Sequence, residues 1–229
     1  MKKSRIDVLM GTSCLELYNL TPSSSAYLKS RNKRVMDIFG ALMGLAAGTP
    51  ILIIAALLIK IVDRIPVVFS QKRLGFLGRE FTIYKLRTLK LIDDRKLATL
   101  ENVQNKPNYE TTTTGKFWRV TSIDEIIQFW LVLKGNMSLI GHRPVPIYYV
   151  QYLDQLEGMN RQKLDHYVAI ISKYKPGMSS LSSVNGRGDL TMQQKMEYDL
   201  IYAQNASFFL DISLLIRTMI VVITRRGAK

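Results

Sequence analysis

Two adjacent carboxylates, Asp124 and Glu125, give this chain its clearest capacity for chemistry. They fall in the first turn of a predicted helix over 123–134, directly after Ser122, and Glu125 has the capping-box spacing from that serine. A helix N-terminus presents unpaired N–H groups and partial positive charge, so a carboxylate there stays ionised and a phosphate can dock beside it. Such a carboxylate can attack phosphorus or hold a hard cation. A simple helix cap at the surface is the open alternative.

The elements that position this pair can be predicted from periodicity. Apolar residues at helical spacing give the helix one buried face, and Gly135 ends it. Short strands are predicted at 66–70 and 79–84, joined by a cationic glycine-containing loop, and the stretch 91–114 is a polar linker with a threonine run at 111–114. Further helices are predicted at about 146–156, 159–173, 191–204 and 207–225, and the last carries two charges that suit a membrane surface or a packed position.

The segment 38–59 contains no charged residue. As a helix it would be about 33 Å long, enough to cross a hydrocarbon core of about 30 Å. It begins too late and runs too long for a signal peptide. Thr49-Pro50 lies at its middle, where proline removes a backbone hydrogen bond. Basic residues stand on both sides, whereas a spanning helix has its basic excess on one: Lys29, Arg31, Lys33, Arg34, Lys60, Arg64, Lys72 and Arg73.

This pattern predicts a helix that enters the cytoplasmic leaflet, breaks at Pro50 and returns to the same face. A kinked span remains the alternative. The chain then divides into a loosely ordered arm (1–28), a re-entrant membrane helix (29–62) and a catalytic domain (63–229). The fold class is α+β and mostly helical, with amphipathic helices at the interface.

Composition limits the partners. The chain has 229 residues and a net charge of +14, which indicates an anionic partner: nucleic acid, acidic lipid or a phosphorylated substrate. The single cysteine, Cys14, excludes an internal disulfide. Two histidines, His142 and His166, are too few and too far apart for a zinc site.

Several motifs occur in a fixed order along the chain: Asp37 before the apolar run, Gln71-x-Arg73-x-Gly75, Phe81-x-x-Tyr84-Lys85-x-Arg87-Thr88, Ser122-x-Asp124-Glu125, Leu133-Lys-Gly-Asn-Met-Ser138, Arg143-Pro144, Lys175-Pro-Gly177, Val184-Asn-Gly-Arg187 and Tyr198-Asp199. As an ordered set over about residues 29–225 they resemble the bacterial sugar transferases, the polyprenyl-phosphate glycosyl-1-phosphate transferases. The chain is similar to the small, monotopic members of that family.

The resemblance implies a reaction and a place for it. A sugar 1-phosphate would pass from a nucleotide-diphosphate sugar, such as a UDP-sugar, to polyprenyl (undecaprenyl) phosphate. The reaction would start a glycan such as exopolysaccharide, capsule, O-antigen or glycoprotein glycan. The enzyme would lie in the bacterial inner membrane with its catalytic domain on the cytoplasmic face. By resemblance, Asp124 is the nucleophile on the β-phosphate, Glu125 binds Mg²⁺, and Lys85, Arg143 and Asp199 are active-site residues.

Other charged residues admit two interpretations. Arg73 and Arg187 could contact phosphate or lipid headgroups. Lys85 and Arg87 would, without this context, equally be solvated charges on a strand. Asp37 beside Lys33 and Arg34 is predicted to form a structural ion pair.

The chain departs from the family pattern at three places. His142 replaces a common proline, Asn136 replaces a common aspartate, and residues 178–183 lack the usual Thr-Gly-Trp-like sequence. The altered loop motivates one rival function, a membrane scaffold for glycan enzymes that has lost catalysis. Nucleic-acid binding is a second rival, disfavoured because much of the charge flanks a membrane segment. The sugar, the pathway and a homodimer stay open.

Overall fold

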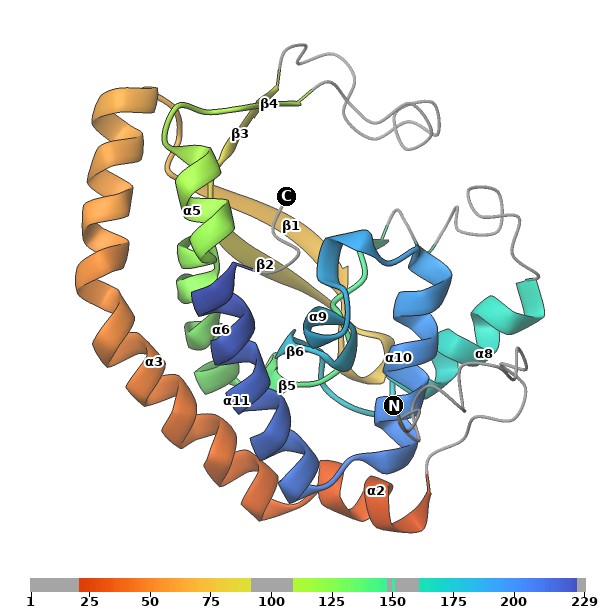
Figure 1. The fold of residues 1–229 in the computed structure, drawn as a ribbon. Helices are drawn as coiled ribbons and strands as arrows, with labels where there is room; N and C mark the ends of the chain where they lie inside the picture. The colour runs from red at the N-terminus through yellow and green to blue at the C-terminus, as the bar shows by residue number, and fades with distance from the viewer. Residues whose placement is uncertain (1–20, 92–108, 148–149, 151–160, 226–229) are drawn as a thin grey trace, which may run out of the picture.

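A long curved helix, α3 (Arg31–Leu58), runs along one side of the computed structural model (Figure 1). The residues that it describes are 21–91, 109–147, 150 and 161–225. A short helix, α2 (Pro22–Leu28), precedes α3 where the sequence predicts a loosely ordered arm; residues 1–20 of that arm lie outside the described residues. The side chain of Ser30 caps α3 by accepting a hydrogen bond from the Lys33 amide at 3.1 Å.

The helix α3 continues through Pro50 without interruption. One π-helical turn, Ile59–Asp63, extends it, and Arg64 ends it in the left-handed conformation. The hydroxyl of Thr49 donates to the carbonyl of Leu45 at 2.6 Å, a contact that bends helices. The predicted break at Pro50 is therefore wrong: α3 is curved, but it is one continuous helix on both sides of the proline (Figure 1).

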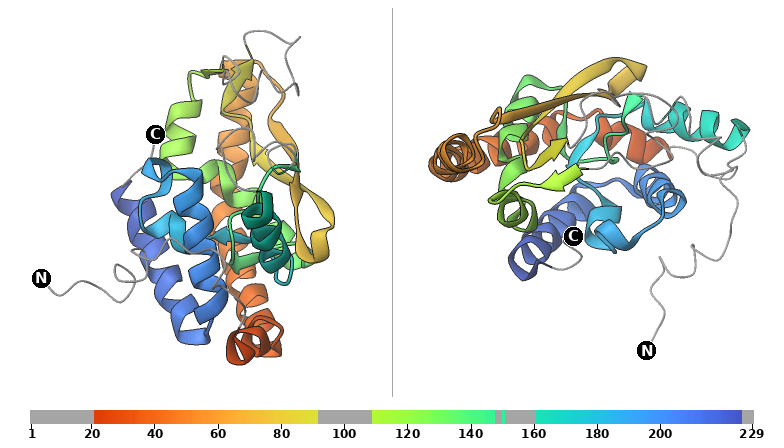
Figure 2. Two further views of the ribbon diagram at one scale, coloured as in Figure 1. Left: turned by 90° about the vertical axis from the view of Figure 1, so that its right-hand side faces the viewer. Right: turned by 90° about the horizontal axis from the view of Figure 1, so that it is seen from above.

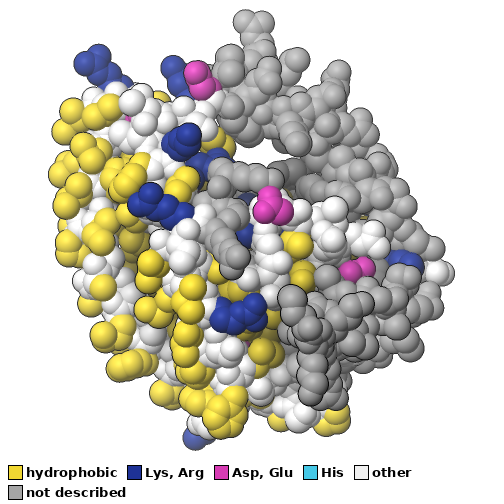
Figure 3. All heavy atoms as spheres, viewed as in Figure 1, with side chains coloured by type: hydrophobic (Ala, Val, Ile, Leu, Met, Phe, Trp, Pro, Cys, Tyr) yellow, Lys and Arg dark blue, Asp and Glu magenta, His cyan; other side chains and the backbone are white. Residues whose placement is uncertain are grey.

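Among the described residues, 31–63 form the one helix that is long and apolar enough to cross a membrane. Only 17% of its most apolar window is buried, unlike the core helix of a soluble protein. Exposed apolar side chains cover its outer face and recur on α11 (Phe208–Thr224) (Figure 3). They include Val35, Phe39, Met43, Ile54, Leu57 and Ile61 on the long helix, and Phe209, Ile216, Ile220 and Ile223 on α11. An apolar surface of this extent indicates association with a membrane.

The inner face of α3 is made of small residues. A Cβ atom at Gly44 would lie 2.5 Å from the ring of Phe129, and one at Gly48 would lie 2.6 Å from Ile126. The sequence suggests that these glycines ease a bend. In the structure they let α3 pack closely against the segment that carries the acid pair.

A β-hairpin lies inside the curve of α3 (Figures 1 and 2). Strands β1 (Val68–Leu74) and β2 (Glu80–Leu86) pair antiparallel, with Phe69 opposite Lys85, and the turn between them contains the short 3-10 helix Phe76–Gly78. The predicted hairpin is confirmed. β1 runs further into the loop than expected, to Leu74, and β2 runs past its predicted end at 84 to Leu86. Lys85 therefore stands on a regular strand.

Two further strand pairs are absent from the prediction. Strands β3 (Leu89–Leu91) and β4 (Tyr109–Thr111) pair antiparallel, and β5 (Ser138–Ile140) pairs parallel with β6 (Gly177–Ser179). Each strand has three residues, too few for an alternation to be recognised in the sequence.

Helices make up most of the remaining fold. After α5 (Gly115–Thr121) come a 3-10 helix, η5 (Ile123–Gln128), and α6 (Phe129–Lys134), which ends at Gly135 with φ 85° as predicted. The predicted helices at 159–173, 191–204 and 207–225 are confirmed as α8 (Arg161–Ile171), α10 (Met192–Asn205) and α11. Two short turns lie between β6 and α10, α9 (Leu181–Val184) and η6 (Arg187–Asp189). Most of the predicted helix at 146–156 lies outside the described residues.

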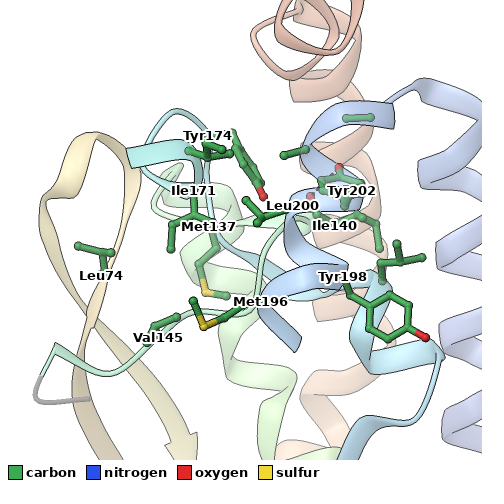
Figure 4. Packing of buried hydrophobic residues seen from close by; sticks show 14 of the residues in the cluster. Leu74, Met137, Ile140, Val145, Ile171, Tyr174, Met196, Tyr198, Leu200 and Tyr202 are labelled. Carbon is green, nitrogen blue, oxygen red and sulfur yellow. Dashed lines mark hydrogen bonds between the residues drawn. The ribbon is translucent and has the colours of Figure 1, made fainter. Parts of the chain in front are cut away.

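The core contains buried tyrosines as well as aliphatic side chains (Figure 4). Beside it, a buried ion network joins α3 to α11. The ammonium of Lys33 lies 2.6 Å from Asp211 and 3.6 Å from Asp37, and Asp211 also accepts hydrogen bonds from Tyr27 and Tyr202, each at 2.8 Å. The predicted Lys33–Asp37 ion pair is confirmed. Helices α2, α3 and α11 are thus joined by a buried ion pair and hydrogen bonds.

Candidate functional site

The acid pair begins the 3-10 helix η5, but its cap differs from the prediction. Ser122 has φ 58°, a left-handed conformation that ends α5, and its side chain caps no amide of η5. The predicted capping box is therefore wrong. The Ser122 hydroxyl instead accepts a hydrogen bond from the Nη2 of Arg187 at 2.6 Å. The turn at Ser122 thus leads directly into the acid pair, and its hydrogen bond holds Arg187 beside the two carboxylates.

Asp124 is only 7% exposed. Burial raises its pKa to about 7, and the negative charge of Glu125 acts in the same direction, while Lys85 and Arg119 oppose the rise. Its proton is therefore lost near neutral pH, and any further cation in the site would favour the ionised form.

Glu125 stays ionised. Burial alone would raise its pKa, but an ion pair and hydrogen bond with Lys85, together with Arg143 and Arg187, lower the pKa below its usual value. Lys85 comes from β2, which lies beside η5. The two neighbouring acids thus have different protonation behaviour, set by their different surroundings.

A cavity of about 890 Å³ opens at the acid pair. Seven of the predicted site residues line it: Arg73, Lys85, Arg87, Asp124, Glu125, Arg143 and Arg187. Arg119 and Lys195, which the sequence analysis did not single out, line it as well. The structure therefore gathers residues from four separate segments into one cationic site around two carboxylates. Such a site suits a substrate with several phosphate charges.

The arginines are held in different ways. Arg73 donates to the carbonyl of Pro144 at 2.7 Å, and Arg87 donates to the carbonyl of Pro66 at 3.0 Å. The second terminal nitrogen of Arg187, Nη1, is buried and has no hydrogen-bond partner among the described residues. A buried guanidinium nitrogen in this state is a donor available to a ligand.

Asp199 does not line the cavity. It is buried beneath it and accepts hydrogen bonds from the backbone amide of Arg143 at 3.3 Å and from the hydroxyl of Tyr167 at 2.9 Å. Burial raises its pKa to about 7. Asp199 therefore positions Arg143 in this structure and does not face the cavity itself.

A polar recess adjoins the cavity, and Gln128 is one of its buried residues. This side chain is 2% exposed, and its Nε2 has no hydrogen-bond partner among the described residues. Ser180 and Ser183, from the loop that departs from the family pattern, line the same recess. Sequence analysis missed Gln128, although a polar residue inside an otherwise apolar helical stretch was the available signal.

His142 is fully buried and plays no part in the cavity lining. Burial lowers its pKa to about 4, and its ring packs edge-on against Tyr174 at 5.1 Å. It is therefore a neutral core residue.

The donor set suits Mg²⁺ better than a transition metal. No group of three or more His, Cys, Asp or Glu side chains that could hold a metal was found in the described part of the chain. Mg²⁺ binds through one or two carboxylates and completes its shell with water and substrate phosphates. Glu125, the acid that stays ionised, could supply such a carboxylate.

The comparisons with known proteins agree with this geometry. Residues 28–225 match the family model described as bacterial sugar transferase. The chain is 34% identical over 222 residues to the UDP-glucose:undecaprenyl-phosphate glucose-1-phosphate transferase of Escherichia coli, covering 94% of this chain and 45% of that protein. It is 32% identical to the undecaprenyl-phosphate galactose phosphotransferase of Salmonella typhimurium, over 92% of this chain and 43% of that protein. The chain thus spans less than half the length of these two relatives.

A shorter relative matches over most of its length. The uncharacterized sugar transferase EpsL of Bacillus subtilis is 33% identical over 195 residues, which cover 85% of this chain and 89% of EpsL. In EpsL, the region that matches this chain therefore makes up most of the protein.

Proposed function

The chain belongs to the bacterial sugar transferase family, and from this premise we propose that it transfers a sugar 1-phosphate from a UDP-sugar to undecaprenyl phosphate at a membrane surface. The observation that carries the proposal is the cavity at the acid pair. It brings Asp124 and Glu125 together with Lys85 and several arginines, next to an apolar outer surface. A soluble diphosphate donor and a lipid acceptor can both reach such a site.

The reaction proceeds in two displacements at one phosphorus atom. A carboxylate oxygen of Asp124 attacks the β-phosphorus of the donor, the bond from that phosphorus to the bridging oxygen breaks, and UMP leaves with the electron pair. A phosphate oxygen of undecaprenyl phosphate then attacks the same phosphorus, and the Asp124 carboxylate is released. The products are UMP and a sugar linked to undecaprenol by a diphosphate. Two steps allow the soluble product to depart before the lipid reacts.

The surrounding cations stabilise the charge that moves in these steps. Glu125 and the donor phosphates would hold Mg²⁺, which supplies charge neutralisation for the leaving phosphate. Arg143 and Arg187 face the same cavity and can donate to phosphate oxygens. Lys85 holds Glu125 in its ionised form.

We also propose that α3 enters and leaves the membrane on one side, with the cavity at the cytoplasmic face. Gly48, near the middle of the apolar run, packs against Ile126, which is next to Glu125. If α3 crossed the bilayer in this packing, the ionised site would lie at the depth of the hydrocarbon, where charges cost several kcal/mol each. A shallow helix keeps its apolar outer face in lipid and the acid pair in water.

Release of UMP tests the reaction. Purified protein in detergent is mixed with each of several UDP-sugars, with and without undecaprenyl phosphate. We expect donor alone to release UMP in a burst equal to the amount of enzyme and to add the mass of one phosphosugar to the chain. Asp124→Asn, which keeps the shape of the side chain, should show neither. Active enzyme without burst or adduct would contradict the covalent step, and wild-type protein that transfers no sugar would favour the scaffold alternative.

A further inference from the structure

The cavity has one wall of opposite character to its cationic side. This wall is formed by α11, whose apolar residues Leu215, Met219, Val221, Val222 and Ile223 line the cavity. Positions 215, 219 and 222 follow the spacing of one helical face. The polar residue within this stripe, Thr218, has its hydroxyl satisfied by the Leu214 carbonyl and the Ser179 hydroxyl, both at 2.7 Å. The wall therefore offers hydrocarbon rather than unpaired polar groups.

This wall reaches the outer surface of the protein. Met219 and Ile223 line the cavity although they are 64% and 76% exposed. The neighbouring Ile216 and Ile220 are 55% and 53% exposed and do not line it. The cavity is therefore open along α11 toward the apolar surface that Figure 3 shows beside it.

The two walls suit the two ends of one amphiphilic molecule. Arginine and lysine side chains match a phosphate group, and aliphatic side chains match a hydrocarbon tail. A UDP-sugar has no hydrocarbon tail, and the aromatic rings that line the cavity, Phe69 and Phe129, lie outside α11. The apolar wall therefore matches the lipid substrate better than the donor.

Resting on the proposed function, we propose that Leu215, Met219, Val222 and Ile223 form an acceptor track, which binds the first isoprene units of undecaprenyl phosphate. The lipid enters from the membrane along α11 with its phosphate leading. Contact between its tail and the track holds the acceptor phosphate at the acid pair. The donor occupies the cationic side and the adjoining recess, so the two substrates use different walls of one cavity.

Equilibrium binding of radiolabelled undecaprenyl phosphate in detergent micelles tests the track without requiring turnover. Ile223→Asn is compared with Ile220→Asn, the same change three residues away on the same helix. Both side chains are exposed, so neither change removes core packing. We expect Ile223→Asn to weaken binding by about four- to fifteenfold, the factor for one or two methylene groups returned to water. Ile220→Asn should bind like wild type.

Two further results separate the possible failures. The KM for the UDP-sugar and the donor-only release of UMP should be unchanged in Ile223→Asn, because the donor does not touch the track. Equally weakened binding of undecaprenyl phosphate in both variants would mean that α11 acts only by general partition into lipid. Ile223→Asn protein that binds undecaprenyl phosphate like wild type would also overturn the proposed track. If wild-type protein itself binds no undecaprenyl phosphate, the proposed function fails rather than the choice of helix.

Discussion

Removing the Lys33 ammonium should destabilise the protein strongly, although Lys33 lies far from the acid pair in sequence. Asp211 is fully buried and depends on Lys33 at 2.6 Å for its counter-charge. Lys33→Met keeps the length of the side chain and removes the ammonium that two buried carboxylates, Asp37 and Asp211, share. Breaking one partner of a buried pair typically costs about 3–5 kcal/mol. For a domain of this size that loss lowers the melting temperature by about 6–20 °C.

A second substitution, Asp211→Asn, should restore part of the stability that Lys33→Met loses, and the hydrogen bonds to Asp37 and Asp211 determine how much. Asp37 keeps the Ser138 hydroxyl at 2.8 Å and the Leu139 amide at 2.9 Å, whereas Asp211 keeps the hydroxyls of Tyr27 and Tyr202. Adding Asp211→Asn to Lys33→Met removes one orphaned charge and leaves an oxygen that can still accept. The double variant should therefore regain a large part of the lost stability, a coupling that a double-mutant cycle measures.

Thermal unfolding in detergent, followed by circular dichroism, gives the melting temperatures. Lys29→Met is the matched control, because it removes the same charge from an exposed position nearby. It should melt within about 2 °C of wild type. The reasoning fails if Lys33→Met melts like this control, or if the double variant is less stable than Lys33→Met alone.

Three further predictions concern the site and the membrane helix. Glu125→Gln should lose nearly all transfer activity, and EDTA should inactivate wild-type enzyme until Mg²⁺ is added back; full activity in EDTA would contradict the metal role. Gln128→Leu, which keeps volume and removes the buried donor, should raise the KM for the UDP-sugar by about tenfold and leave binding of undecaprenyl phosphate unchanged; an unaltered KM would show that the recess is not used by the donor. A membrane-impermeant thiol reagent should label Cys14 only in permeabilised cells, whereas replacing Thr49-Pro50 by Leu-Leu should expose part of the population to the reagent from outside; strong outside labelling of wild type would mean that the segment spans.

The parts of the fold that were predicted correctly are those with a local signal. Alternation and a cationic turn located the hairpin, helical periodicity located α8, α10 and α11, and Gly135 marked the end of α6. The acid pair and its cations were identified by ordered motifs, and the structure brings seven of the eight predicted site residues to one cavity. Each of these features depends on residue types at short spacing.

The features that were missed depend on long-range contacts. Serine is a residue type typical of helix caps, which is why a cap was predicted at Ser122. Its left-handed backbone and its hydrogen bond from Arg187 come instead from the packing of distant segments. The threonine run at 111–114 has the composition of a linker. In the structure Thr112 and Thr114 both donate to Asp63, at 3.1 and 2.5 Å, and Thr114 also accepts from the indole of Trp118. The prediction of a linker therefore missed these hydrogen bonds, which hold the end of the long helix to α5.

Hydropathy predicted the exposed apolar face of the long helix α3 but not the contacts of its inner face. Its outer face is apolar and exposed, and that half of the pattern predicted a membrane segment correctly as far as composition allows. Its inner face carries glycines where Phe129 and Ile126 approach, and Arg34 at its start donates to the carbonyls of Val132 and Leu133 at 2.7 Å. These contacts fix both ends of the segment that begins with the acid pair. If α3 lies in lipid as proposed, the same helix also supports the segment that carries the acid pair. The depth of α3 in the membrane would then set the height of the proposed active site above the lipid.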